Sequence, residues 1–310
     1  MLSSQPPICP APLLAQAQAL RMLTTVVVNA GTELAMESAR QAHQAGIIYP
    51  ILVGDLVQIK SLAKNMDWQL NSDQLVSAEG EQAAAEKAVA LVHSRDAKML
   101  MKGHVHSDTL LRAVLDKDKG LRTGVRLSHV FHMTVPYSDQ ALCVTDAVIN
   151  VAPDYTTQRH ILRNGIGLMH ALGYNKPNIA LLSATEVSTP AMPSSMLAKD
   201  ILDSVTGEDA LQAQIFGPVA FDGAVSPEAA KVKGIDTPGA GHADMLLVPN
   251  IETGNAIFKQ LVYFNSATAA GLILGAKVPI ILTSRADPAV ARLASAALGV
   301  VYANWLLQQP

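Results

Sequence analysis

The sequence predicts an α/β protein built mainly on parallel β-sheet. Short apolar runs alternate with Ala-rich amphipathic stretches, a pattern typical of βαβ units. The chain has 310 residues, of which 49% are hydrophobic and 16% charged, so it has material for a substantial core. Because one domain usually has roughly 100 to 200 residues, two domains or one large α/β unit are expected.

Predicted strands and helices follow one another along most of the chain. The strands are expected at Thr24–Ala30, Ile48–Asp55, Lys98–Gly103, Asn178–Ala184, Asp244–Asn250 and Val278–Ser284. The helices are expected at Thr32–Ala45, Glu79–His93, Ser107–Asp116, Thr156–Leu172, Ser194–Ser204, Gly254–Ala269 and Pro288–Leu298.

The segment Ser128–Asn150 departs from this alternation. It reads as consecutive strands around a Pro-Tyr-Ser turn, which indicates either antiparallel pairing or a crossing between domains. A domain boundary is therefore expected near residue 137.

Charge and hydropathy exclude several classes of function. A net charge of -3, without a Lys/Arg cluster interleaved with aromatics, argues against a nucleic-acid partner. The longest apolar runs, Ala269–Ala276 and Val278–Leu282, are far shorter than the roughly 18 to 20 residues that cross a bilayer, so no membrane association is expected. The N-terminal stretch has early prolines and no basic region, so it does not read as a signal peptide and a cytoplasmic location is expected.

The two cysteines, Cys9 and Cys143, have no metal-binding spacing. Both are expected to be free thiols, with Cys143 a small buried hydrophobe.

Five stretches place polar residues where a strand ends and a helix begins. Open α/β sheets bind ligands at this edge, because helix N-termini there present free N–H groups and positive partial charge. The candidate residues are Gly103 and Ser107; Arg122 and Ser128, with Arg126 between them; Asp146 and Asn150; Asn250, Gly254 and Asn255; and Ser284, Arg285 and Asp287.

Each stretch also has an ordinary structural interpretation. Ser107, Asn250 and Asp287 are typical helix-capping residues, and a loop Arg is commonly just solvated. Asp146 and Asn150 interrupt an apolar strand, so each needs a buried partner or a ligand. Capping does not explain Arg285, a charge that follows the apolar run of Val278–Leu282 after only Thr283 and Ser284.

The spacing of His104 and His106 does not predict a metal site, because no carboxylate accompanies the pair in the sequence. The common nucleotide, hydrolase and zinc fingerprints are also absent from the chain. Spacing alone therefore predicts an α/β protein that binds a phosphorylated or otherwise anionic small molecule.

Five motifs resemble, in order, those of the phosphate acetyltransferase/phosphate butyryltransferase family. They are Leu100–Leu115 (LMKGHVHSDTLLRAVL), Val144–Asp154 (VTDAVINVAPD), Phe216–Ile235 (FGPVAFDGAVSPEAAKVKGI), His242–Leu261 (HADMLLVPNIETGNAIFKQL) and Lys277–Asp287 (KVPIILTSRAD). The similarity runs from about Thr24 to Leu298, and the SRAD form with the GLRTG loop is closer to the butyryltransferase branch.

The resemblance implies two α/β domains of the isocitrate/isopropylmalate dehydrogenase-like kind, with an active-site cleft between them. It assigns residues 1–137 and 270–310 to the first domain and residues 138–269 to an inserted second domain. It also implies a homodimer and the reaction acyl-CoA + phosphate ⇌ acyl phosphate + CoA, with CoA as a substrate and with neither a metal nor a permanently bound cofactor.

The resemblance also suggests roles for particular residues. Ser284 would hydrogen-bond the thiol or the tetrahedral intermediate, and Arg285 would balance phosphate or pyrophosphate charge. In the acetyltransferase branch an Asp seven residues after the motif Ser is proposed as base; here that position is Ala291, and the nearest carboxylate is Asp287.

The family pattern further points to the other candidate residues as substrate-binding groups. Phosphate would contact Ser128, Arg122 and the turn from Gly103 to Ser107, and the elbow after the strand at Asp244–Asn250 would contribute Asn250, Gly254 and Asn255. Asp222 matches a motif Asp that either orders its loop or touches substrate.

Three alternatives remain open at the level of sequence. The enzyme could prefer acetyl over butyryl groups, or the chain could be a CoA or acyl-phosphate binding protein without turnover. A metal-dependent decarboxylating dehydrogenase of the same fold would need clustered Asp ligands and a nucleotide loop, which the sequence does not display.

Overall fold

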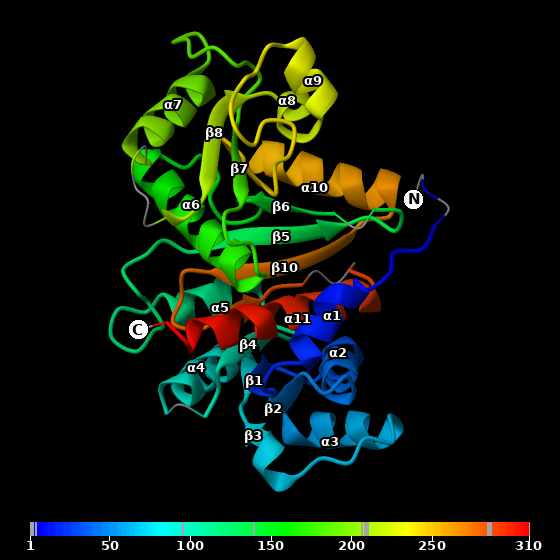
Figure 1. Cartoon of the computed structure of the whole chain (residues 1–310). Helices are drawn as coiled ribbons and strands as arrows, with labels where there is room; N and C mark the ends of the chain where they lie inside the picture. The colour runs from blue at the N-terminus through cyan, green and yellow to red at the C-terminus, as the bar shows by residue number, and fades with distance from the viewer. Residues whose placement is uncertain are drawn as a thin grey trace. The chain divides into compact units, whose positions relative to one another are not determined.

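The computed structural model describes residues 3, 5–94, 96–138, 140–205, 207, 211–283 and 287–309. Helices and strands alternate along this part of the chain, which confirms the predicted α/β fold (Figure 1). The chain divides into two compact units. The terminal unit comprises Ile8–Val125 and Ala270–Pro310, and the central unit comprises Met1–Pro7 and Arg126–Ala269.

The sheet of the terminal unit has the strand order β3-β2-β1-β4-β11-β10. Its strands are β1 (Leu23–Val28), β2 (Ile48–Gly54), β3 (Leu75–Ser77), β4 (Met99–Lys102), β10 (Thr268–Leu274) and β11 (Ile280–Ile281). Neighbours pair in parallel from β3 to β11, and β10 pairs with β11 in antiparallel fashion. β1 is a near-continuous run of Thr and Val with only Thr24 not buried, as expected for a strand covered on both faces.

The helices of the terminal unit are α1 (Ala11–Gln18), α2 (Glu33–Gln44), α3 (Leu56–Asn65), α4 (Gly80–His93), α5 (Ser107–Val114) and α11 (Ala289–Leu306), with a 3₁₀ turn η1 at Ser72–Gln74. Local signals define their ends: the Asp55 carboxylate, for example, accepts the N–H of Val57 at 2.8 Å and so caps α3.

The helix α11 is long and apolar enough, by length and composition, to cross a membrane, which the short apolar runs of the sequence did not indicate. However, 72% of it is buried inside the molecule, as in the core helix of a soluble protein. Its Ser295 accepts the N–H of Gly271 in β10 at 3.0 Å and so joins the helix to the sheet.

The sheet of the central unit has the strand order β5-β6-β9-β7-β8. Its strands are β5 (Ser128–Thr134), β6 (Ala141–Thr145), β7 (Asn178–Leu182), β8 (Gln214–Val219) and β9 (Met245–Leu247), and its helices are α6 (Tyr155–Ala171), α7 (Pro193–Val205), α8 (Phe221–Val225), α9 (Pro227–Val232) and α10 (Ile251–Asn265). The strands β6, β9, β7 and β8 run parallel, and β5 pairs antiparallel with β6.

Residue 137 lies in the turn that joins the antiparallel strands β5 and β6. Of the two interpretations of Ser128–Asn150, antiparallel pairing is the one found. The compact units divide between Val125 and Arg126 and between Ala269 and Ala270, whereas the sequence placed the first crossing near residue 137.

One hydrophobic cluster of the central unit lies between its sheet and helices α8 and α10, and α6 and α7 bury further apolar side chains. Buried apolar side chains from β5, β6, β7, β8 and β9 form this cluster, and Phe131 stacks on Phe258 of α10 with ring centroids 4.2 Å apart. This packing fixes the strand ends, from which the candidate site residues project.

Candidate functional site

In the central unit, the parallel strands β6, β9, β7 and β8 end at one edge of the sheet, and Asp146 directly follows β6 there. Asp146 is 2% exposed, and its carboxylate accepts four N–H groups. Oδ1 accepts those of Val148 at 2.8 Å and Ile149 at 2.9 Å, and Oδ2 accepts those of His129 at 3.1 Å and the Asn150 side chain at 2.7 Å. A buried carboxylate satisfied in this way shapes the loop after β6 and has a structural role.

Asn150 and Ser128 belong to the same polar network. The Asn150 amide also donates to Leu127 O at 2.9 Å, which ties the loop to the start of β5. Ser128 is fully buried, and its hydroxyl accepts from Asn164 at 2.9 Å, while Asn164 also donates to Arg126 O at 3.0 Å. These side chains position the backbone that carries Arg126.

Arg126 lines a cavity of about 240 Å³ that lies within the central unit. The lining residues are Arg126, Ile149, Asn150, Val151, Ala152, Pro153, Asp154 and Thr157. Arg126 is the one cation among them, and a guanidinium binds phosphate or carboxylate oxygens in a two-pronged manner.

Asp154 also lines this cavity, and it caps α6, because its carboxylate accepts the N–H of Thr157 at 2.8 Å. The hydrogen bonds from Thr157 lower the pKa of Asp154, and the charges of Arg126 and His160 lower it further. The N–H of Arg126 donates to His160 Nδ1 at 3.2 Å, so helix α6 and the start of β5 are held together at the cavity.

The elbow after β9 is a capping turn. Asn250 Oδ1 accepts the N–H of Thr253 at 2.9 Å and its hydroxyl at 2.7 Å. Gly254 lets helix α10 approach the loop after β6, because a Cβ there would lie 2.9 Å from the Cα of Ala147 and from the carbonyl oxygen of Asp146. Asn255 donates weakly to Ala147 O at 3.5 Å. The structure thus brings these three predicted residues against the Asp146 loop.

Asp222 orders loops at the end of β8. Its carboxylate accepts from Lys233 Nζ at 2.7 Å and from the N–H of Gly223 at 2.9 Å, and Lys233 also binds Glu186 at 2.9 Å. The bond from Lys233 lowers the pKa of Asp222, and the N–H of Gly223 contributes to the same shift.

In the terminal unit, the turn between β4 and α5 uses its backbone N–H groups for the fold. Gly103 N donates to Val28 O at 3.0 Å, and His104 N donates to Asn29 O at 2.9 Å. A Cβ on Gly103 would lie 2.5 Å from Val28 O, so only glycine allows this approach. The N–H of Gly103 is therefore occupied and not free to cradle a phosphate.

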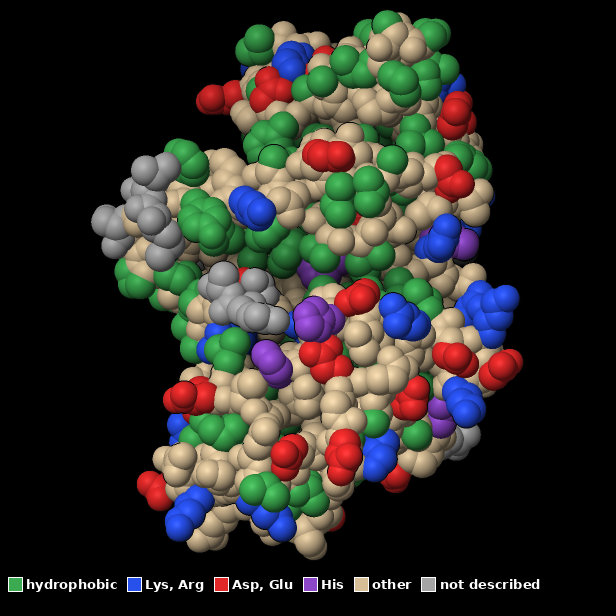
Figure 2. All heavy atoms as spheres, turned by 180° about the vertical axis from the view of Figure 1, so that it is seen from behind, with side chains coloured by type: hydrophobic (Ala, Val, Ile, Leu, Met, Phe, Trp, Pro, Cys, Tyr) green, Lys and Arg blue, Asp and Glu red, His purple; other side chains and the backbone are tan. Residues whose placement is uncertain are grey.

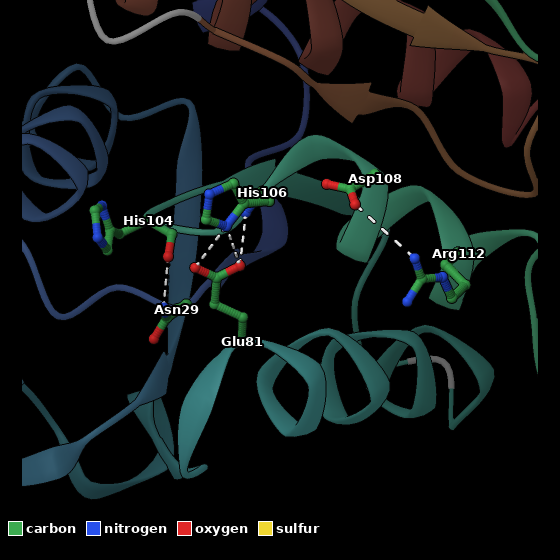
Figure 3. A network of polar contacts seen from close by, with 6 residues as sticks. All are labelled: Asn29, Glu81, His104, His106, Asp108 and Arg112. Carbon is green, nitrogen blue, oxygen red and sulfur yellow. Dashed lines mark hydrogen bonds and ion pairs between the residues drawn. The ribbon is translucent and has the colours of Figure 1, made fainter.

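Helix α5 begins at Ser107, with His106 in the N-cap position, so the exposed Ser107 is not the capping residue that its sequence context indicated. Glu81 from the first turn of α4 accepts the N–H of the N-cap residue His106 itself at 2.8 Å (Figure 3). The same carboxylate contacts His106 Nδ1, at 2.8 Å from Oε2 and 3.0 Å from Oε1. The bonds from His106, its backbone N–H first, lower the pKa of Glu81.

The Arg122 loop lies against the turn between β10 and β11. Arg122 forms an isolated bridge with Ala276, and the hydroxyl of Thr123 donates to Gly275 O at 2.7 Å. The Arg122 side chain is exposed. It belongs to the terminal unit, whereas Ser128 belongs to the central unit.

Ser284 and Arg285, the predicted catalytic pair, lie outside the described residues. Asp287 precedes Pro288, which holds the N-cap position of α11, so Asp287 lies one residue before the cap. The carbonyl of Asp287 accepts from the Arg292 guanidinium. Burial lowers the pKa of Arg292, against the opposing effects of the Asp287 and Glu37 charges.

Ala291, where the acetyltransferase pattern has an Asp, is 3% exposed, and its carbonyl accepts from Ser295 at 2.8 Å. A carboxylate at this position would need a buried partner. The small residue therefore suits the packed first turns of α11.

Several participants in these networks were not predicted as site residues, among them Arg126, Asn164, Glu81 and His106. Arg126 was noted in its stretch but had no distinguishing signal. Asn164 follows Arg163 in an exposed-looking polar step of the helix and carries no distinguishing signal, and nothing in the sequence connects Glu81 with His106. Within the described ranges, no group of three or more His, Cys, Asp or Glu side chains could hold a metal ion.

Basic and acidic side chains are interspersed on the face shown in Figure 2, consistent with the scattered charges of the sequence. On this face, the described side chains therefore form no broad basic surface for an anion.

Comparisons with known proteins agree with this architecture. The chain is 42% identical over 291 residues to a phosphate acetyltransferase of Rhizobium meliloti, covering 94% of this chain and 92% of the relative. It is 38% identical over 284 residues to a phosphate butyryltransferase of Clostridium acetobutylicum, covering 91% and 94%. Its relatives thus include enzymes named for acetyl transfer and for butyryl transfer, and both kinds of enzyme are acyltransferases.

Among solved structures, a branched-chain phosphotransacylase from Enterococcus faecalis V583 matches with a TM-score of 0.78 and 31% identity, over 91% of this chain and 99% of that one. A 4-hydroxythreonine-4-phosphate dehydrogenase from Burkholderia phymatum shares the fold at a TM-score of 0.55 and 12% identity, over 91% and 98%. This likeness fits the dehydrogenase-like fold that was expected.

A family model described as "Phosphate acetyl/butaryl transferase" matches residues 81–300, which is more than half of the chain. The family expected from the five motifs is confirmed, and the protein belongs to this family of acyltransferases.

Proposed function

We propose that this protein transfers a short acyl group reversibly between CoA and inorganic phosphate: acyl-CoA + phosphate ⇌ acyl phosphate + CoA. The observation that carries the proposal is the similarity, over more than nine-tenths of the chain, to a phosphate acetyltransferase and a phosphate butyryltransferase. The substrates are acyl-CoA and phosphate in one direction, and acyl phosphate and CoA in the other.

The reaction proceeds by direct attack in a ternary complex. Holding two reactants beside one carbonyl can contribute roughly 7 to 11 kcal/mol. Donors aimed at the oxyanion of the tetrahedral intermediate contribute about 3 to 4 kcal/mol each, judged by their removal. We assign Ser284 to such a hydrogen bond and Arg285 to the anionic charge, as the family motif suggests; Asp287 stays a candidate whose carbonyl already binds Arg292.

We further propose that the cavity at Arg126 receives phosphate or the phosphoryl end of acyl phosphate. Its volume of about 240 Å³ is that of roughly eight waters in the liquid, which leaves room for a phosphate and part of its hydration shell. Asp146, Asn150 and Ser128 act here as positioning residues, because their side chains bind other protein groups in the structure.

The preferred acyl group is butyryl or another short chain longer than acetyl, in keeping with the SRAD motif and the GLRTG loop. An acetyl preference is the second candidate, favoured by the 42% identity with the acetyltransferase. Phosphorolysis of acetyl-, propionyl-, butyryl- and valeryl-CoA, followed as release of CoA thiol, separates the two by their kcat/KM.

The same assay tests the function itself. Thiol release must require inorganic phosphate, and Arg285→Ala must lower kcat/KM by more than about tenfold. No release with any of these thioesters, together with calorimetric binding of CoA, would favour a binding protein without turnover. Activity of Arg285→Ala within tenfold of the unmodified protein would instead make Arg285 structural.

A cytoplasmic homodimer is the remaining part of the proposal. Exposed aromatic side chains near the end of α10, Tyr263 at 51% and Phe264 at 56%, together with Tyr137 at 63%, support an apolar contact surface. Light scattering on the eluting protein would give twice the chain mass of 32.8 kDa, and a monomer at micromolar concentration would contradict the dimer. Cell fractionation tests the location.

A further inference from the structure

His106 and Glu81 form a carboxylate–imidazole pair at the carboxyl end of β4 (Figure 3). The ring nitrogen Nδ1 lies 2.8 Å and 3.0 Å from the two carboxylate oxygens of Glu81. Because a carboxylate only accepts, Nδ1 carries the hydrogen, and the neutral ring presents its lone pair on Nε2.

Capping alone does not require this contact. Glu81 already accepts the backbone N–H of His106 at the start of α5, at 2.8 Å. Its contact with the imidazole ring is an additional one. The His106 side chain is 68% exposed, so the edge of the ring that bears Nε2 is accessible from solvent. An oriented imidazole with one nitrogen held by a carboxylate is the arrangement of a general base that works near neutral pH.

The pair lies where a ligand of this unit is expected. β4 pairs in parallel with β1 on one side and with β11 on the other, so the carboxyl ends of the three strands share one edge. Ligands of open α/β sheets bind outside that edge. Ala291, by contrast, leaves α11 without a carboxylate at the position of the expected base, and it is buried.

We propose that His106 is the general base for the CoA thiol, with Glu81 as its positioning residue; this rests on the acyl transfer proposed above. In the direction of acyl-CoA synthesis, Nε2 takes the thiol proton while the sulfur attacks the acyl carbon. The C–S bond forms, the C–O bond to phosphate breaks, and phosphate leaves with the electron pair. The imidazolium then gives its proton to the released phosphate or to water, and the reverse direction retraces these steps.

Among the residues that the structure describes, the charged groups near the ring come from α4 and from the turn and first helical residues around His106. Glu81 comes from α4, His104 from the same turn interacts with that carboxylate, and Asp108 lies two residues beyond His106, where it pairs with Arg112 at 3.9 Å. The hydrogen bond from Nδ1 to the Glu81 carboxylate fixes the orientation of the ring, so removing the carboxylate must leave the ring free to rotate.

The test is the pH profile of kcat and KM for acyl phosphate plus CoA, measured for the unmodified protein, His106→Asn, Glu81→Gln and the control His242→Gln. His106→Asn is expected to lower kcat by about 100-fold or more with little change in KM. Its remaining rate should rise with pH through about 8.5 as the thiol ionises unaided. Glu81→Gln is expected to retain more activity than His106→Asn, because it leaves the base in place and removes only the carboxylate that orients it. His242→Gln, at an exposed histidine of the central unit, is expected to match the unmodified protein.

A purely structural role would lower activity without altering the shape of the pH profile, and that result would overturn the inference. So would a His106→Asn variant with kcat within about threefold of the unmodified protein, while thermal unfolding confirms that each variant is folded. An unmodified protein without acyl transfer would remove the proposed function and this inference with it. If the unmodified protein transfers acyl groups but the pH profile of kcat does not change in His106→Asn, only this inference is removed and the proposed function stands.

Discussion

The side-chain amide of Asn150 donates to Oδ2 of Asp146 at 2.7 Å. Because Asn150 also donates to Leu127 O, this bond closes a ring of contacts that joins the end of β6 to the start of β5. Four donors thus converge on one buried carboxylate. These hydrogen bonds hold the loop after β6 in place, and residues of this loop line the cavity at Arg126.

Asp146→Asn should destabilise the protein. The amide keeps the volume but presents an NH₂ group toward donors, so at least one buried N–H loses its acceptor. We expect the free energy of unfolding to fall by about 2 to 4 kcal/mol. Urea denaturation measures this fall. Asp108→Asn, at an exposed position, serves as the control and should change stability little. Equal stabilities of the two variants would contradict the structural role of Asp146.

Arg126→Ala should raise KM for inorganic phosphate. Hydrogen bonds to charged groups contribute about 1.5 to 3 kcal/mol, which corresponds to roughly 10- to 100-fold. The KM for phosphate of Arg126→Lys should lie between those of the unmodified protein and Arg126→Ala. An ammonium group keeps the positive charge but lacks the planar, two-pronged guanidinium. Steady-state phosphorolysis with varied phosphate measures the effect, and Arg112→Ala is the exposed arginine control. An unchanged KM for phosphate in Arg126→Ala would place the phosphate elsewhere.

Acidification should destabilise the fold through two buried histidines of β5. Burial lowers the pKa of His132 to about 4, and it also lowers that of His129, where the charge of Asp146 opposes the shift. The unfolded chain binds these protons near pH 6.5, while the folded chain takes them up only near pH 4. Stability is therefore complete above about pH 6.5 and falls as the pH drops from there toward 4.

The slope of this fall is at most about 1.4 kcal/mol per pH unit for each histidine. Denaturant titrations at pH 4.5, 5.5 and 6.5 measure it, and His132→Leu should reduce it by one histidine's share. The exposed His242 provides the control His242→Gln, whose slope should equal that of the unmodified protein. A slope in His132→Leu equal to that of the unmodified protein would contradict the contribution of His132.

The main strands of the terminal unit were predictable because β1, β2 and β4 are apolar runs bounded by turn residues. β10 was not: its run of Thr, Ala, Gly, Leu and Ile was read partly as the end of a helix. A short apolar run has no periodicity that separates strand from helix, and its partners lie far away in the sequence. Pairing with β11 is what makes this segment a strand.

The candidate site was predictable to a smaller extent. Gly103, Asn250 and Gly254 were found because turns and helix starts have local signals, yet those signals mark backbone geometry, and backbone geometry is what these residues serve. The contact of Glu81 with His106 joins the starts of two helices 25 residues apart. No local pattern encodes such a contact, so only the packing of α4 against α5 reveals it.

Cys143 should be unreactive in the folded protein. It is 1% exposed, and burial raises its pKa to about 12, so almost no thiolate forms at neutral pH. Iodoacetamide at pH 8 followed by peptide mass mapping should label Cys9 faster, although partial burial raises the pKa of that thiol too. Cys143 should become labelled only in denaturant; labelling at the Cys9 rate without denaturant would contradict the burial of β6.

Gly254→Ala offers a test in which the sign of the effect is diagnostic. In an ordinary helix this change stabilises by up to about 1 kcal/mol, because alanine is the better helix former. Here the new Cβ would lie 2.9 Å from Ala147 Cα, from Ala147 Cβ and from Asp146 O, so α10 must shift away from the loop after β6. We expect a loss of about 1 to 3 kcal/mol in the free energy of unfolding, together with a higher KM for phosphate, because the same loop lines the Arg126 cavity.

The double variant Gly254→Ala/Ala147→Gly separates the possible causes of this loss. Removing the Ala147 methyl leaves the contacts with Ala147 Cα and Asp146 O, so stability should be recovered only in small part. Full recovery would mean that the methyl alone is the obstacle, and a stabilised single variant would mean that α10 and the Asp146 loop are not in close contact.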